Sequence, residues 1–277
     1  MSKFILFLFG ALLVCGNAKA NDVVGKQLSC PAGYIGVPAM LPYTSKDFCV
    51  SKYEMKNVDG YPISHPDGLP WVNVTRNEAR LICKSLGDGY SLISNAQWQT
   101  IARNIEQVGA NWSGGQPGAG QLNRGHSDLS PPFALPAGLS DSLGCFGTGE
   151  ECSKTEWNLQ KRTHLLSNGE VIWDFAGNVS EWLIDDPRTF GNFSPVRELN
   201  DCATFTDYYH RELFCSSDHT LGRIHGIGVV FQAPTDALVR GGAWWNDGFE
   251  EAGVFFTLPL WSMEVSRDIG FRCVWSP

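Results

Sequence analysis

The sequence predicts an α+β domain with two main helices, short strands and much irregular structure, crosslinked by disulfides. Three observations point to this class. The 277 residues include 30 Gly, which favours turns over long helices and strands. The chain has 10 Trp but only 18% charged residues, so we expect tryptophans to fill the core. Two capping-box patterns mark the two helices.

The first helix is predicted to begin after Thr75, because Thr75 and Glu78 have the spacing of a capping box. Gly87 stands where a C-terminal glycine is expected. The apolar face, at helical spacing, is formed by Ala79, Ile82, Cys83 and Leu86. The second helix is predicted to follow the capping box of Ser94 and Gln97. Its buried face is formed by Trp98, Ile101, Ala102 and Ile105.

Short strands are predicted where β-branched and aromatic residues form mostly apolar runs. These runs are 34–37, 48–53, 171–173, 238–245, 253–256 and 269–275. The segments 109–156 and 185–234 are predicted to be irregular, which is usual for functional or crosslinked segments. No internal repeat or flexible linker is evident, so we expect one domain over residues 21–277.

The N-terminus has the pattern of a cleaved secretory signal over residues 1–20. Lys3 is followed by the apolar run 4–14, which is too short to span a bilayer, and Ala18 and Ala20 form a cleavage site. We therefore expect a periplasmic or extracellular protein with no membrane span. Cys15 would suit a lipoprotein, but Val14 before it is larger than such sites usually accept.

The formal net charge of −8 limits the classes of partner. Nucleic acids and anionic membranes attract surfaces rich in Lys and Arg, so an acidic chain is poorly suited to either. Cation binding remains compatible with this charge. We expect a protein, peptide or carbohydrate ligand, and the sequence does not specify which.

Eight cysteines follow Cys15, and an even number in an exported chain indicates disulfides. No C-x-x-C pair occurs, which gives no support to zinc-ribbon or thioredoxin-like sites. Spacing alone does not determine connectivity. As a hypothesis we pair the cysteines as Cys30–Cys49, Cys145–Cys152, Cys202–Cys215 and Cys83–Cys273.

The segment 167–182 (SNGEVIWDFAGNVSEW) concentrates the most constrained chemistry in the chain. Gly177 and Asn178 both tolerate positive φ and predict a turn. Asp174, Asn178 and Glu181 bring three oxygen-bearing side chains to that turn, and Ca²⁺ prefers such ligands. The alternative is a turn capped by its own side chains beneath a tryptophan cluster.

The order of motifs along the chain resembles the formylglycine-generating enzyme, or sulfatase-modifying factor, family. The motifs that carry the resemblance are 48–54 (FCVSKYE), 70–83, 92–103 (LISNAQWQTIAR), 174–182 (DFAGNVSEW), 240–244 (RGGAW) and 270–273 (GFRC). The resemblance implies a C-type-lectin-like α+β fold. It also implies a disulfide between the first helix and the GFRC strand, which supports Cys83–Cys273.

The resemblance implies structural calcium at the central turn. Asp174 and Glu181 would bind the ion through their side chains, and Gly177 and Val179 through backbone carbonyls. A second calcium site in the family uses an asparagine that aligns with Asn123, and Asp141 is a weaker match for an aspartate of that site. Copper or iron is not expected.

Catalytic members of the family oxidise a substrate cysteine to formylglycine with copper held by two cysteines after an R-G-G-S motif. The corresponding positions here are Asn246 and Glu251, and Ala243 replaces the serine of the motif. No cysteine occurs between Cys215 and Cys273. Because Cu(I) requires soft thiolate ligands, the resemblance does not extend to this chemistry.

Two functions therefore compete. The first is a non-catalytic, calcium-stabilised binding or structural module, whose candidate binding surface is formed by Trp244, Trp245, Asn246, Glu251 and Trp261. Core packing is the alternative role for these aromatic residues and for the neighbouring Phe249, Phe255 and Phe256. The second function is a metal-dependent oxidase, of formylglycine-generating or non-haem-iron type, with a diverged site. An iron site would need histidines to converge in the fold, from His126, His164, His210, His219 and His225.

Overall fold

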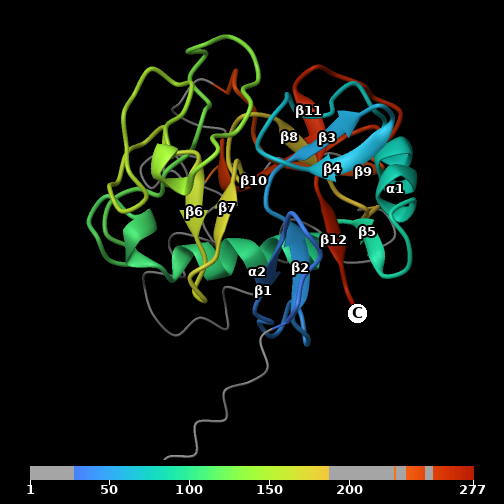
Figure 1. Ribbon diagram of the computed structural model, residues 1–277, viewed down its shortest axis with the longest axis horizontal. Coiled ribbons are helices and arrows are strands. Elements are labelled where there is room, and N and C mark those ends of the chain that lie inside the picture. The colour runs from blue at the N-terminus through green and yellow to red at the C-terminus, as the bar shows by residue number, and fades with distance from the viewer. Residues whose placement is uncertain (1–27, 187–227, 229–234, 247–251) are drawn as a thin grey trace, which may run out of the picture.

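The computed structural model describes residues 28–186, 228, 235–246 and 252–277 (Figure 1). In chain order the described elements are β1 (Tyr34–Val37), β2 (Phe48–Ser51), β3 (Met55–Val58), β4 (Tyr61–Ser64), α1 (Arg76–Lys84), β5 (Tyr90–Leu92), α2 (Asn95–Glu106), the 3₁₀ turns η1 (Gly109–Asn111) and η2 (Asp141–Leu143), β6 (Thr163–Leu165), β7 (Val171–Trp173), β8 (Ser180–Trp182), β9 (Ala237–Gly241), β10 (Gly253–Leu260), β11 (Ile269–Phe271) and β12 (Cys273–Trp275). The class is α+β with short strands, as the sequence predicts. No described helix is long and apolar enough to cross a bilayer.

The described strands form two four-stranded sheets and two separate hairpins. The first sheet has the order β1-β2-β12-β5 and is antiparallel throughout. The second has the order β10-β9-β8-β11, in which β11 runs parallel to β8. The hairpins are β3–β4 and β6–β7. In Figure 1 the β6–β7 hairpin and α1 lie on opposite sides of the view.

The run 269–275 does not form the single strand that the sequence predicts. Ile269–Phe271 pairs with β8 in one sheet, whereas Cys273–Trp275 pairs with β2 and β5 in the other. The run changes sheet at Arg272, whose side chain is fully buried. This residue therefore lies where the two sheets meet.

Both predicted capping boxes are present. Thr75 caps α1 reciprocally with Glu78, and Ser94 caps α2 reciprocally with Gln97. The first helix ends earlier than predicted, because its C-cap is Ser85 and Gly87 lies beyond the helix. Gly87 nevertheless adopts a positive φ of 121°, which a glycine tolerates.

Tryptophans occupy the core, as their number suggests. Trp98 is completely buried and stacks on Phe175, with ring centroids 3.9 Å apart. Its indole N–H donates to the carbonyl of Val254, 2.7 Å away, which satisfies its polar group. The stack connects α2 to the central turn, and the hydrogen bond connects α2 to β10. Other fully buried tryptophans are Trp112, Trp173 and Trp182.

Three disulfides crosslink the described residues, and all three are pairs that we hypothesised from the sequence. They are Cys30–Cys49, Cys83–Cys273 and Cys145–Cys152, with sequence separations of 19, 190 and 7 residues. The long-range pair joins α1 to β12, so it holds a helix to the first sheet. The pair proposed between Cys202 and Cys215 lies outside the described residues.

Candidate functional site

The turn between β7 and β8 is shaped by three residues with positive φ. Asp174 has a φ of 53°, Gly177 of 76° and Asn178 of 63°. At Gly177 a Cβ atom would lie 2.6 Å from the carbonyl oxygen of His126, so no larger residue fits without a shift. The side chain of Asn178 accepts from the backbone N–H of Leu135 at 2.7 Å. The turn is thus packed directly against the segment 124–135.

The Asp174 carboxylate is engaged by Arg162. Arg162 Nε donates to Asp174 Oδ1 at 2.7 Å, and Nη2 donates to Oδ2 at 2.8 Å. The remaining guanidinium N–H groups donate to the carbonyls of Leu135, Pro136 and Phe146. Both side chains are essentially inaccessible to solvent. The five donors of Arg162 therefore have five acceptors, in a bidentate geometry that strengthens the pair.

The Glu181 carboxylate is engaged by Arg272 in the same way. Arg272 Nη2 donates to Glu181 Oε1 at 2.8 Å, and Nε lies 3.1 Å from each carboxylate oxygen. The other donors of Arg272 reach the carbonyls of Ser51, Trp173 and Asp174. Burial raises the pKa of Glu181, and the Arg272 charge opposes that rise. A single arginine thus joins β2, the turn and β8.

A third carboxylate, that of Glu54, caps the turn from the opposite side. Its Oε1 accepts from the backbone N–H of Val179 at 3.1 Å, and its Oε2 accepts from Asn178 Nδ2 at 2.7 Å. Lys56 Nζ lies 4.0 Å from Oε2. Burial raises the pKa of Glu54 to about 8, with the nearby Asp174 charge adding to the rise. Burial also lowers the pKa of Lys56.

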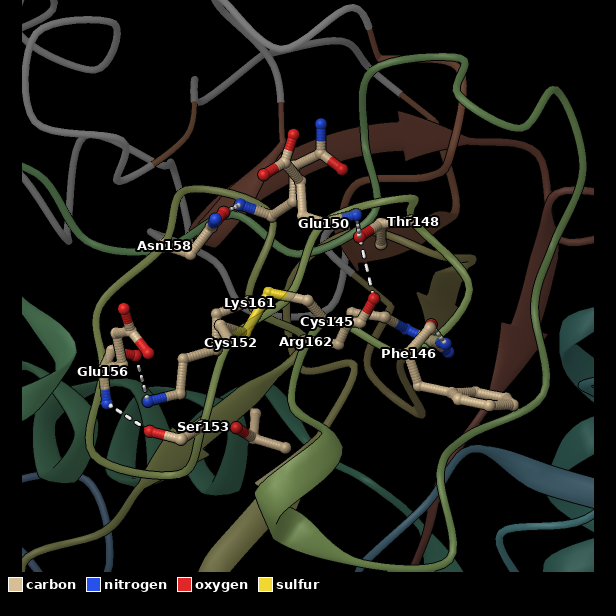
Figure 2. Close-up of a disulfide and its surroundings, with 12 residues drawn as sticks. Cys145, Phe146, Thr148, Glu150, Cys152, Ser153, Glu156, Asn158, Lys161 and Arg162 are labelled. Carbon is tan, nitrogen blue, oxygen red and sulfur yellow. Dashed lines mark hydrogen bonds between the residues drawn. A yellow bond between two sulfur atoms is a disulfide. The ribbon is translucent and has the colours of Figure 1, made fainter.

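The Cys145–Cys152 disulfide closes a loop that contacts the same arginine (Figure 2). The Arg162 guanidinium donates to the Phe146 carbonyl, and the backbone N–H of Arg162 donates to the Gly144 carbonyl at 2.7 Å. Thr148 donates its hydroxyl to the Cys145 carbonyl within the loop. The disulfide loop therefore helps to position Arg162 against Asp174.

Asp141 and Asn123, the residues suggested for a second calcium site, have separate hydrogen-bond partners. Asp141 accepts from Lys52 Nζ at 3.0 Å and from the Trp173 indole N–H at 2.9 Å. Asn123 Nδ2 donates to the carbonyls of Lys161 and Thr163. Its Oδ1 is buried and has no hydrogen-bond partner. Asp141 therefore forms a salt bridge, and Asn123 offers one neutral oxygen.

These side chains do not fit a calcium ion at the central turn. Ca²⁺ takes six to eight oxygen ligands, whereas both oxygens of Asp174 and both oxygens of Glu181 already accept from arginine. No group of three or more His, Cys, Asp or Glu that could hold a metal occurs among the described residues. Arg272, the one charge in the run 269–275, is the sequence signal that could have pointed to these ion pairs.

The candidate binding surface is only partly brought together. Trp244 and Trp245 follow β9 at its Gly241 end, whereas Trp261 follows Leu260, which pairs with Ala237 at the other end of β9. Trp244 is 4% exposed and therefore belongs mainly to the core, while Trp245 is 39% and Trp261 53% exposed.

Asn246 and Glu251 are the positions that the resemblance aligns with the catalytic cysteines, and the structure describes only the first of them. The Asn246 side chain is buried and accepts from the backbone N–H of Ala243, so it caps the turn after β9. Glu251 lies outside the described residues.

The described histidines do not gather into an iron site. His126 Nε2 lies 2.9 Å from the carbonyl oxygen of Phe133, and His164 Nε2 lies 3.0 Å from that of Asn123. Burial lowers the pKa of both rings, that of His164 to about 4. His210, His219 and His225 lie outside the described residues.

Residues 32–277 match the sulfatase-modifying factor enzyme 1-like domain family. Among solved structures, the chain is similar to PvdO from Pseudomonas aeruginosa, with 14% identity, a TM-score of 0.41, and coverage of 89% of this chain and 92% of that one. It is also similar to Treponema denticola variable protein 1, with 13% identity, a TM-score of 0.36, and coverage of 84% and 85%. CarF matches with 13% identity, a TM-score of 0.38, and coverage of 84% and 88%. No curated protein matches the chain.

The family match covers the described core, both helices and the central turn. The chain therefore belongs to the sulfatase-modifying factor enzyme 1-like domain family, and its described elements form an α+β fold.

Proposed function

We propose that this chain is an exported member of the family that acts as a non-catalytic binding or structural module, in one domain over residues 21–277. The observation that carries the proposal is that Asn246 and Glu251 stand where the resemblance aligns the two copper-binding cysteines. All six described cysteines are in disulfides and offer no thiolate. An amide and a carboxylate are hard ligands and do not hold Cu(I) as two thiolates do.

The disulfides also support export to the periplasm or the extracellular space. Structural disulfides persist in oxidising compartments and are rare in the cytosol. The chain has three among its described residues, which agrees with the signal-like residues 1–20.

The binding surface that we propose lies at the Gly241 end of β9. Trp245 is partly exposed there and its indole N–H is bonded to Asp268. The Arg267 guanidinium lies over the Trp244 ring, 5.1 Å from its centroid. The Trp245 indole, fixed by Asp268, offers a ring face for stacking, and the Arg267 guanidinium is held on the adjacent Trp244. This combination suits a carbohydrate or peptide ligand.

Replacement of Trp245 tests this surface. Purified peptidoglycan and an array of immobilised glycans serve as probes, and the mature protein is compared with Trp245→Ala and Trp261→Ala. We expect Trp245→Ala to lose binding about tenfold or more, as removal of a central aromatic contact typically does. Trp261→Ala is the matched control, because Trp261 is exposed at the other end of β9. Equal binding by all three proteins would contradict the assignment.

A further inference from the structure

The central turn lies within a buried group of charges that contains as many cations as carboxylates. Each of the six side chains belongs to a residue with a relative exposure of 2% or less. The members are Glu54, Asp174 and Glu181 on the acidic side, and Lys56, Arg162 and Arg272 on the basic side. We call these residues the charge cluster. Uncompensated buried charges are strongly unfavourable, so the balance of the cluster matters to the fold.

The cluster is balanced when its least tightly paired members, Glu54 and Lys56, are both ionised or both neutral. Arg162–Asp174 and Arg272–Glu181 are close, bidentate ion pairs. Glu54 and Lys56 are 4.0 Å apart and are both buried. If both are ionised, their charges cancel, and if burial makes both neutral, the two arginine pairs still cancel. The formal charge of the cluster is zero in either state.

A calcium ion at the turn would disturb this arrangement in two ways. It would add two positive charges to a neutral, buried group beside three protein cations, where Coulomb repulsion is weakly screened. It would also have to displace arginine from the oxygens of Asp174 and Glu181. Displacement would leave two guanidinium groups buried without their carboxylates, which is among the costliest arrangements in a protein interior.

We propose that the chain supplies the cations of this turn itself, so that Arg162 and Arg272, with Lys56 beside Glu54, take the place of the calcium that the family resemblance implies. The turn is then held together in the absence of metal. Three elements distant in sequence provide the cations, since Lys56 lies on β3, Arg162 precedes β6, and Arg272 lies between β11 and β12. Metal availability therefore does not control the folding of this turn.

Thermal unfolding of the mature protein with EDTA or with excess Ca²⁺ tests the proposal. Glu181→Gln removes the charge of one expected ligand with little change in shape, and Glu151→Gln, at an exposed position, is the matched control. We expect the wild-type melting temperature to be the same in EDTA and in Ca²⁺. We expect Glu181→Gln to melt lower than wild type by the same amount in both solutions.

The possible results separate the turn from calcium sites elsewhere in the chain. A Ca²⁺-dependent rise in melting temperature that occurs in wild type and Glu151→Gln but is lost in Glu181→Gln would overturn the proposal. A rise of equal size in all three proteins would place calcium elsewhere and leave the turn metal-free, as proposed. If Glu181→Gln fails to fold, Asp174→Asn, which alters the other expected side-chain ligand, takes its place in the same comparison.

Discussion

Replacing Arg272 with glutamine is expected to lower the free energy of unfolding by about 3–5 kcal/mol, the typical cost of removing one partner of a buried ion pair. Arg272 is completely buried and bonds the Glu181 carboxylate together with three backbone carbonyls. Its loss leaves a buried carboxylate and several carbonyls without donors. Denaturant unfolding followed by tryptophan fluorescence measures the change, because tryptophans are buried in the core.

The matched control for this prediction is Arg80→Gln. Arg80 lies on α1 and is exposed, so its replacement should change stability by no more than about 0.5 kcal/mol. Similar unfolding midpoints for the two variants would show that Arg272 does not hold the sheets together.

Removing the Cys83–Cys273 disulfide by a double replacement with alanine is expected to cost about 5 kcal/mol in the chain-entropy model, because the bond closes a loop with a sequence separation of 190 residues. The same double replacement at Cys145 and Cys152, whose separation is 7 residues, is expected to cost about 2 kcal/mol. Equilibrium unfolding of both double variants under identical conditions gives the comparison. A larger loss from the short loop would contradict the entropic account.

The sequence predicted best what depends on neighbouring residues. The two capping boxes are local hydrogen-bond patterns, and both helices begin where Thr75 and Ser94 predict. The turn at Gly177 and Asn178 followed from their tolerance of positive φ, and both residues adopt it. Such signals need no knowledge of the rest of the fold.

The sequence could not predict contacts that depend on chain topology. Arg162 and Asp174 are 12 residues apart, and nothing in the pattern around either residue names the other as its partner. Glu54 reaches Val179 across 125 residues, and Arg272 reaches Ser51 across 221. For the same reason the sequence could not place Trp245 and Trp261 relative to β9, because the register of β9 with β10 was unknown.

The expectation of calcium at the central turn stays a prediction, whereas the shape of that turn follows from the sequence. Asp174, Gly177 and Glu181 occupy a turn of the expected shape. Their ligand capacity depends on Arg162 and Arg272, whose roles emerge only when the sheets are assembled. A fold provides positions, and the surrounding side chains decide what those positions bind.

The central claim is that the chain keeps the fold of its family without the copper chemistry. The most direct test is to load the mature protein with Cu(I), remove the excess, and measure retained copper alongside oxidation of a cysteine-containing sulfatase peptide. A family member that has both catalytic cysteines is the positive control. We predict that this chain retains only substoichiometric copper and leaves the peptide cysteine unmodified. Stoichiometric copper together with formylglycine formation would contradict the account.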